Sequence, residues 1–173
     1  MANLYRSRRR EIHAINSHNL SWSESRVSDV DVLAARGMSR SRLGADLYRL
    51  KYGFDRSAYE PCFKELRSKF ARRRQNLPSP YFHAALHEFL DDRCTACGGR
   101  MAIPINANEV VACSTCNGSG ERRYTDEERA AACSVRCSVW SRYERDYLDV
   151  LECIHRAINA HQSGMSRMLA STP

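Results

Sequence analysis

The sequence predicts a mainly α-helical protein with one small β-hairpin module inserted into it. Outside residues 93–121, apolar residues recur at steps of three and four, the spacing that gives a helix one apolar face. Inside residues 93–121 that spacing stops, and two CxxC pairs, four glycines and a short apolar stretch take its place. The chain has 173 residues, of which 43% are hydrophobic, so it is long enough to bury a core.

The same patterns divide the chain into four segments. We expect a basic flexible arm at 1–28, a helical domain at 29–92, the four-cysteine module at 93–121, and a helix-turn-helix with a long C-terminal helix at 122–173. The arm shows weak periodicity and contains a cluster of arginines, namely Arg6, Arg8, Arg9 and Arg10. Such an arm is either a solvated tail or a segment that touches a phosphate backbone.

Residues 29–92 predict four helices. Two short ones, separated by Gly37, place apolar residues at Val30, Leu33, Ala34, Leu43, Leu47 and Leu50. A third, at 58–74, has the apolar stripe Tyr59, Phe63, Leu66 and Phe70 and ends in Arg72, Arg73 and Arg74. Pro78 and Pro80 interrupt the pattern, and a fourth helix at 81–92 resumes it with Phe82, Leu86, Phe89 and Leu90.

A capping box opens the last segment. Thr125 caps the first turn of a helix that begins at Asp126, and Glu128 completes the box. This helix is expected to end near residues 134–138, and a long helix then follows from about 139 to 162. Its apolar stripe is Trp140, Tyr143, Tyr147, Leu151, Ile154 and Ile158. A short helix, a turn and a longer helix make a helix-turn-helix.

Two CxxC pairs carry the clearest chemical signal. They consist of Cys94, Cys97, Cys113 and Cys116, with fifteen residues between the pairs. This spacing is typical of a tetrahedral zinc site, because each CxxC turn points both sulfurs at one ion. Four protein ligands leave no open position, so we expect one zinc ion with a structural role.

The chain between the pairs predicts a β-hairpin at residues 101–112 that turns at 106–108. Positive φ angles are expected at the four glycines of the module, Gly98, Gly99, Gly118 and Gly120. Such a module buries little by itself, so zinc binding, worth roughly 10 to 16 kcal/mol, is expected to fold it. We expect the remaining cysteines to be buried small side chains and not a second metal site; they are Cys62, Cys133, Cys137 and Cys153. We likewise expect His83 and His87 to be ordinary histidines and not metal ligands.

Charge and hydropathy bear on partners and location. The net charge is +7, which favours polyanionic partners. Residues 1–80 contain 17 Lys and Arg against 8 Asp and Glu, whereas residues 81–173 contain 10 against 12. Contact of the second half with a polyanion must therefore depend on local arrangement. No apolar run reaches the roughly 18 residues of a membrane span, and the N-terminus has no apolar signal segment, so we expect a cytoplasmic location without membrane contact.

Sequence signatures of catalysis are not found. The chain has no HExxH, zinc-deaminase, P-loop or GxSxG motif, so we expect a protein that is not an enzyme. The stretch CSTCNGSG resembles half of a DnaJ chaperone zinc repeat. That chaperone region has four CxxCxGxG units beside a J domain, which this chain does not contain. A chaperone-like protein that binds unfolded chains is therefore the weakest of the hypotheses.

The order of motifs across residues 29–165 resembles the late-gene antitermination protein Q family of lambdoid phages. The elements are DVLAARGM, the pair CTAC, a hairpin, CSTCNGSG followed by RRY, a capped helix, and SVWSRYERDYLDVLEC. The resemblance implies a sequence-specific DNA-binding protein that docks on double-stranded DNA at a phage late promoter. It further implies loading onto paused RNA polymerase that still holds sigma factor, resistance of that polymerase to pauses and terminators, and action in the bacterial host cytoplasm.

The apolar stripe of the last helix leaves a polar face for DNA. We expect that face, at the N-terminal end of the helix, to consist of Ser138, Ser141, Arg142 and Arg145. Arg122, Arg123 and Arg136 flank it and are better placed for the phosphate backbone. Each arginine has an alternative role as a solvated partner of Asp146 or Asp149. Nascent RNA is a further candidate partner for the basic first half.

Two hypotheses therefore remain from different classes. In one, the protein is a phage late-gene antiterminator that binds DNA and polymerase. In the other, it is a zinc-containing, sequence-specific DNA-binding repressor or activator without a role in elongation.

Overall fold

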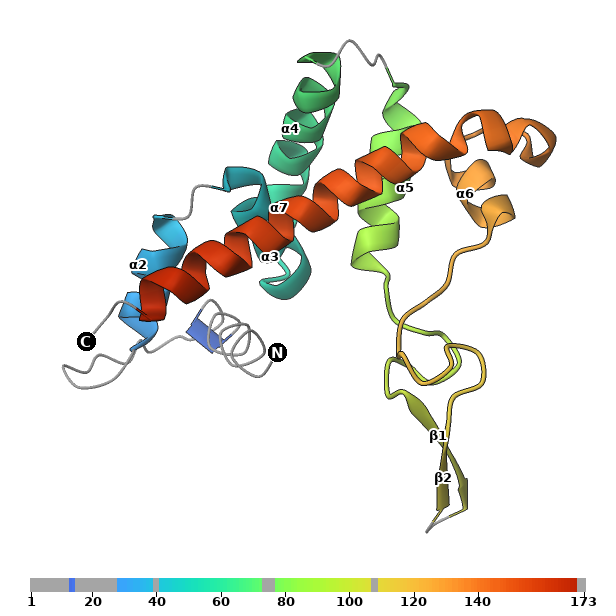
Figure 1. Ribbon diagram of the computed structural model, residues 1–173, viewed down its shortest axis with the longest axis horizontal. Helices are drawn as coiled ribbons and strands as arrows, with labels where there is room; N and C mark the ends of the chain where they lie inside the picture. The colour runs from blue at the N-terminus through green and yellow to red at the C-terminus, as the bar shows by residue number, and fades with distance from the viewer. Residues whose placement is uncertain (1–12, 15–27, 39–40, 73–76, 107–108, 171–173) are drawn as a thin grey trace. The chain divides into compact units, whose positions relative to one another are not determined.

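The computed structural model describes residues 13–14, 28–38, 41–72, 77–106 and 109–170 (Figure 1). Most of the predicted arm, together with Arg40, Arg73 and Arg74, lies outside the described residues. Within the arm, Ala14 is buried and packs in one cluster with Val32 and Met165.

The protein is mainly helical with one small sheet, as the sequence predicts. Its helices are α2 (Asp29–Gly37), α3 (Arg42–Tyr52), α4 (Tyr59–Arg72), α5 (Ser79–Leu90), α6 (Asp126–Ala132) and α7 (Glu144–Ala170), with short 3₁₀ helices η1 (Arg56–Ala58) and η2 (Cys137–Arg142). The sheet pairs β1 (Ala102–Asn106) with β2 (Glu109–Ala112) in antiparallel register. Among the described helices, none combines the length and the apolar character needed to cross a membrane.

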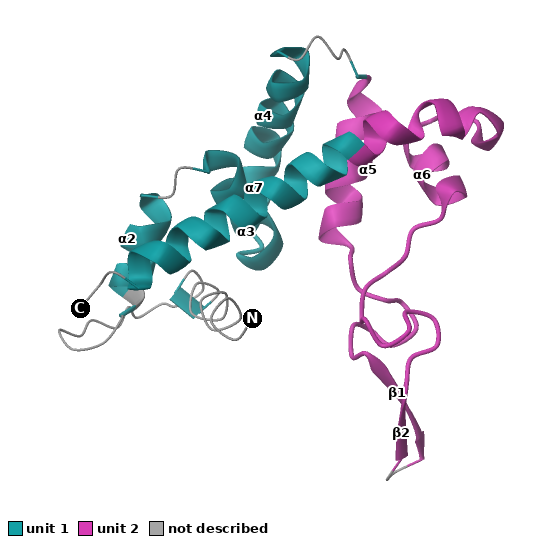
Figure 2. Cartoon of the chain, viewed as in Figure 1, with its two compact units in different colours: residues 1–77, 149–173 teal, residues 78–148 magenta. Residues whose placement is uncertain are grey.

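The chain forms two compact units (Figure 2). Unit 1 contains residues 1–77 and 149–173, and unit 2 contains residues 78–148. Helix α7 begins in unit 2 and continues into unit 1.

Helix α3 packs on α4 in unit 1 and also passes close to α7 at one point. Leu43, Leu47 and Leu50 of α3 are buried, as predicted. Gly44 permits this close approach to α7, because a Cβ at this position would lie 2.1 Å from the Ala157 carbonyl oxygen. The Ser41 hydroxyl, which caps α3, also donates to that carbonyl at 3.0 Å.

The predicted apolar face of α2 is only partly confirmed: Leu33 is half-buried and packs against the cluster of Ala14, Val32 and Met165. Val30 is 42% exposed and Ala34 is exposed, whereas Val32 and Ala35 are buried. The short helix offers apolar residues in two overlapping registers. Packing of Val32 against Met165 of α7 decides between them, and local periodicity cannot encode that contact.

Helix α5 of unit 2 begins earlier than the sequence predicts. It begins at Ser79 and includes Pro80, although the sequence pattern predicts a break at this proline. Proline fits the first turn because the amide that it lacks has no partner within the helix there. The predicted core positions Phe82, Leu86 and Phe89 are buried.

The long C-terminal helix begins later than predicted. Residues 137–142 form η2, and α7 starts only at Glu144 and extends to Ala170. A 3₁₀ helix has three residues per turn, so the side-chain register shifts between η2 and α7. Trp140 and Tyr147 remain buried in edge-to-face contact at 5.5 Å, whereas Tyr143, predicted to be buried with them, is 41% exposed.

Candidate metal centre

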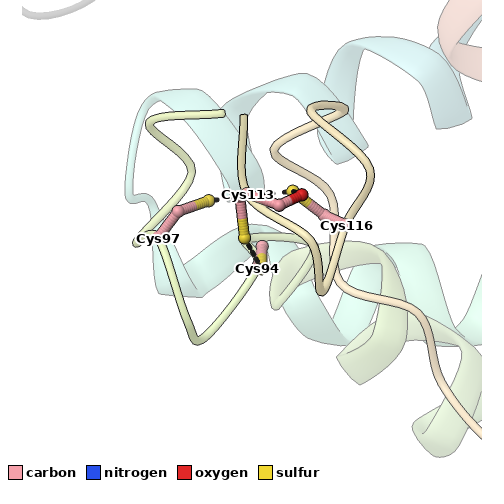
Figure 3. A group of neighbouring side chains, drawn as sticks. All are labelled: Cys94, Cys97, Cys113 and Cys116. Carbon is pink, nitrogen blue, oxygen red and sulfur yellow. Dashed lines mark hydrogen bonds between the residues drawn. The ribbon is translucent and has the colours of Figure 1, made fainter. Parts of the chain in front are cut away.

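Four buried cysteines lie close together on the two CxxC turns (Figure 3). Their sulfur atoms all lie within 4.8 Å of one another, and the set is Cys94, Cys97, Cys113 and Cys116. The sulfurs are 3.9 Å apart between Cys94 and Cys113 and 3.8 Å apart between Cys97 and Cys116. All eight cysteines of the chain are described and none forms a disulfide, so the cluster is available to hold a metal ion.

The sulfur geometry fits a tetrahedral ion. Metal–sulfur bonds of about 2.3 Å at tetrahedral angles place neighbouring sulfurs about 3.8 Å apart. The two separations in the cluster, 3.9 and 3.8 Å, agree with that spacing. A disulfide would require about 2.05 Å, so these thiols are arranged for a shared ion and not for oxidation in pairs.

Turns with left-handed backbone bring the thiols together. The predicted positive φ angles are confirmed at Gly98, Gly99, Gly118 and Gly120. Gly120 is also sterically required, because a Cβ there would lie 3.0 Å from the Gly99 carbonyl oxygen. In the first turn, Met101 occupies the position of the second glycine of a CxxCxGxG unit, and it adopts the same left-handed region with φ of 67°.

One backbone amide acts directly on the cluster. Gly120 N–H donates to the Cys116 sulfur at 3.2 Å. Burial by itself raises the pKa of the Cys116 thiol. The hydrogen bonds from this amide and from the neighbouring cysteines outweigh burial and lower the pKa to about 6. The lowered pKa favours the thiolate of Cys116, which is the form in which a cysteine binds a metal.

The hairpin contributes little to its own stability. Its register pairs Ala102 with Ala112 and Ile103 with Val111. Ile103 packs against the cysteine cluster, whereas Val110 is 65% exposed. Because so little apolar surface is buried, the four sulfurs are the main structural centre of this module.

Two antiparallel stretches of chain, residues 92–94 and 120–122, join the module to the helices of unit 2, and we call them the neck. Cys94 N donates to the Gly120 carbonyl at 2.9 Å, and Arg122 N donates to the Asp92 carbonyl at 2.8 Å. Arg93 and Glu121 form a bridge between these two contacts. The entering and leaving chains of the module are therefore held side by side.

Arg122 ties this neck to α6. Its guanidinium donates to the Asp91 carboxylate and, at 2.9 Å, to the Glu128 carboxylate. It also lies 4.3 Å from the centre of the Tyr124 ring, whose hydroxyl donates to the Asp91 carbonyl at 3.0 Å. Glu128 belongs to the predicted capping box of α6, which is confirmed in both directions with Thr125. The neck and the start of α6 thus share one network.

A second network fixes α6 against α5 and α7. The Glu88 carboxylate accepts two hydrogen bonds from Arg129, at 3.0 and 2.7 Å, and one from the Tyr147 hydroxyl at 2.7 Å. The side chains of Glu88 and Arg129 are only 14% and 20% exposed. Burial and the adjacent Glu88 carboxylate raise the pKa of Tyr147, so the phenol stays protonated and remains the donor.

The predicted DNA-contact residues lie in several places in unit 2. Three of them, Ser138, Ser141 and Arg142, belong to η2, and Arg136 directly precedes it. Arg145 belongs to α7, and Arg123 lies in the loop before α6. All six side chains are exposed. Arg122 instead lies in the neck with two carboxylate partners. Among the described residues, no acidic side chain forms an ion pair with Arg136, Arg142 or Arg145. The expected alternative partners, Asp146 and Asp149, are among those residues and do not pair with them.

The other cysteines differ from one another. Cys62 and Cys133 are buried as predicted, and burial raises the pKa of their thiols to about 12 and about 11. Cys137 is exposed and Cys153 is half-buried, so the prediction of burial is wrong for Cys137. Cys137 is the first residue of η2, and Trp140, not Cys137, fills the interior there. His83 and His87 are exposed, and the described residues contain no metal-ligand cluster besides the four cysteines.

The sequence signals do not account for every member of the site. The hydrogen bonds among Glu88, Asp91, Arg129, Tyr147 and their partners have no local sequence signal, because the partners lie 31 to 59 residues apart along the chain. Comparison of the sequence with protein-family models and with curated proteins gives no match.

Proposed function

We propose that this protein is a phage late-gene transcription antiterminator that binds DNA at a late promoter and modifies RNA polymerase. The observation that carries the proposal is an exposed polar surface on η2 and the start of α7, attached through α6 to the four-cysteine module. The order of these parts along the chain resembles the order of motifs in the protein Q family of lambdoid phages, and this resemblance supports the proposal.

The metal of this proposal is zinc. Four thiolates in a tetrahedral arrangement suit zinc, which has no redox chemistry that would threaten its ligands. Because all four positions are taken by protein, the ion would hold the two CxxC turns together and would leave no site for water or substrate.

DNA reading is assigned to a helix-turn-helix formed by α6, the following turn, η2 and the start of α7. The turn contains Ser134 in the left-handed region with φ of 58°, which lets the chain reverse directly after α6. Trp140 is buried beneath η2 and keeps the opposite face exposed. Arg142 and Arg145 extend from that face without an acidic partner among the described residues, so their guanidinium groups are available to guanine or phosphate.

The flanking arginines have different roles in this proposal. Arg123 and Arg136 are exposed at the edges of the helix-turn-helix and suit the phosphate backbone. Arg122 is held by Asp91 and Glu128, so it positions α6 relative to the metal module and does not need to touch DNA.

Retention on polymerase would require more than charge. Residues 81–173 contain 10 Lys and Arg against 12 Asp and Glu, a poor balance for holding DNA nonspecifically during elongation. Contacts with polymerase itself would supply that retention, and polymerase is the partner that the family resemblance implies.

A transcription assay with purified protein tests the proposal. Host polymerase holding sigma factor is started at a late promoter with the cognate site and an early pause, upstream of an intrinsic terminator. Readthrough is expected to rise only on this template and to fall with Arg142→Ala. Arg156→Ala is the matched control, because Arg156 is an exposed arginine of α7 that pairs with Glu152.

The alternative hypothesis predicts a different result in the same assay. If the protein occupies the site and changes initiation while readthrough stays constant, it is a DNA-binding repressor or activator without an elongation role, and the antiterminator proposal is wrong.

A further inference from the structure

Residues 51–56 of unit 1, Lys-Tyr-Gly-Phe-Asp-Arg, comprise the end of α3, a turn at 53–55 and the first residue of η1, and we call them the 51–56 turn. The turn joins α3 to η1. Phe54 at its centre is 73% exposed, the largest value for any large hydrophobic side chain among the residues described. An exposed phenylalanine has no packing role that would explain its place here.

The backbone at Phe54 is also unusual. Its φ is 52°, in the left-handed region that bulky residues rarely adopt. Asparagine or glycine would fit this conformation better and would expose no apolar surface. Strain of this kind persists where the surroundings enforce it, and it concentrates at functional sites.

Arg49 of α3 forms hydrogen bonds with both the backbone and a side chain of the turn. Its carbonyl accepts hydrogen bonds from Gly53 N at 2.9 Å and from Asp55 N at 3.2 Å. Its guanidinium donates to the Asp55 carboxylate through both Nε and Nη2. Asp55 in turn accepts from Ser57 N at 3.0 Å. The backbone on both sides of Phe54 is therefore held in place by hydrogen bonds.

The segment of chain that carries the ring contains more basic than acidic residues, and the carboxylate of the turn, Asp55, is paired with Arg49. Lys51 and Arg56 flank the turn, and Arg56 is exposed. Tyr52 is half-buried and packs on the buried Tyr48 ring at 4.6 Å. Across α3, η1 and α4, residues 42–72 contain 8 Lys and Arg against 4 Asp and Glu. This balance favours a polyanion over an apolar or a basic protein surface.

We propose that the 51–56 turn binds single-stranded nucleic acid, with a base stacked on Phe54 and phosphates neutralised by Lys51 and Arg56. Unpaired bases expose flat faces that stack on aromatic side chains, and cations beside the ring follow the backbone. A duplex keeps its bases stacked on each other, so it cannot use the ring without unpairing. The proposal goes beyond the antiterminator function, because it requires neither a late-promoter site nor polymerase.

Binding of labelled 12-nucleotide oligomers, measured by fluorescence anisotropy on the full chain with its metal, tests this inference. Unstructured RNA and DNA strands of equal sequence are compared with a duplex of unrelated sequence. Phe54→Ala is expected to weaken binding of the single strands about 5- to 160-fold, the range for loss of one stacked base, and to leave the duplex within about 2-fold. Equal losses for RNA and DNA would indicate base stacking alone, and a larger loss for one strand type would identify the natural ligand.

Two further variants separate binding from folding. Phe54→Asn removes the ring but tolerates the left-handed backbone, so it is expected to lose binding as Phe54→Ala does while the melting temperature stays equal or rises. Phe54→Trp is expected to keep wild-type affinity. Met38→Ala is the matched control, because Met38 is 69% exposed in the same unit outside the turn.

The electrostatic part has its own readout. Each of Lys51→Ala and Arg56→Ala is expected to reduce the slope of log affinity against log salt by about 0.7 for single strands. Wild-type affinity in both Phe54→Ala and Phe54→Asn would overturn the inference. So would loss of polymerase binding with intact oligonucleotide binding, which would make Phe54 a protein contact. The antiterminator proposal is judged separately, by readthrough of the wild type and of Arg142→Ala on the late-promoter template, because Arg142 lies outside the 51–56 turn.

Discussion

Replacing Arg129 with methionine removes the centre of the network that fixes α6 in unit 2. The change keeps a long, helix-compatible side chain but deletes both hydrogen bonds to Glu88, at 3.0 and 2.7 Å. The Glu88 carboxylate then retains the hydrogen bond from the Tyr147 hydroxyl, at 2.7 Å. A carboxylate that is 14% exposed would be left without its counter-charge.

The expected cost is about 2 to 4 kcal/mol of unfolding free energy. Breaking a fully buried ion pair from one side costs about 3 to 5 kcal/mol, because the remaining charge is desolvated and unpaired. The Arg129 side chain is 20% exposed, so water reaches this pair in part and the cost falls below the upper end of that range.

Urea unfolding at constant zinc measures this cost. A Trp22→Phe background leaves Trp140, which packs on Tyr147, as the fluorescent reporter. The double variant with Glu88→Gln is expected to cost at least about 1 kcal/mol less than the sum of the single changes, because the neutral amide needs no counter-charge. Arg156→Met, which removes an exposed pair with Glu152, is the control and is expected to leave the urea midpoint nearly unchanged. A cost below about 1 kcal/mol for Arg129→Met, or strict additivity with Glu88→Gln, would refute the reasoning.

Two other predictions concern DNA and pH. Arg142→Ala is expected to weaken binding to cognate DNA by about 1 to 3 kcal/mol and to change binding to random-sequence DNA little, as measured by gel-shift titration. Equal losses on the two duplexes would make Arg142 a phosphate contact. The Thr125 amide, together with Arg122, holds the pKa of the Glu128 carboxyl below its ordinary 4.5. The capping contribution of Glu128 is therefore complete above that value and lost as the pH falls through the lowered pKa. A carboxyl ¹³C NMR titration with a midpoint at or above 4.5 would contradict the capping contact.

The features that the sequence predicted correctly are those encoded over short distances along the chain. The Thr125–Glu128 box, the positive φ angles of the module glycines and the CxxC spacing each depend on residues a few positions apart. Their geometry is nearly independent of the rest of the fold. Local sequence alone is therefore enough to predict them.

The features that the sequence missed depend on distant partners. The buried face of α2 is decided by Met165, more than a hundred residues after Val32. The use of Arg122 as a positioning residue depends on Asp91, 31 residues earlier. The 3₁₀ helix at 137–142 has an apolar spacing that also suits an α-helix, so local periodicity does not distinguish the two. The left-handed Phe54 breaks a local preference and has no sequence signal.

The zinc content of the purified chain tests the central claim most directly. Elemental analysis is expected to find one zinc per chain in the wild type and in Cys137→Ser, whose exposed cysteine lies outside the cluster. Cys113→Ser is expected to lose the zinc and the amide protection of residues 94–120 while most of the helical circular dichroism remains. Undiminished zinc in Cys113→Ser would contradict the four-cysteine centre.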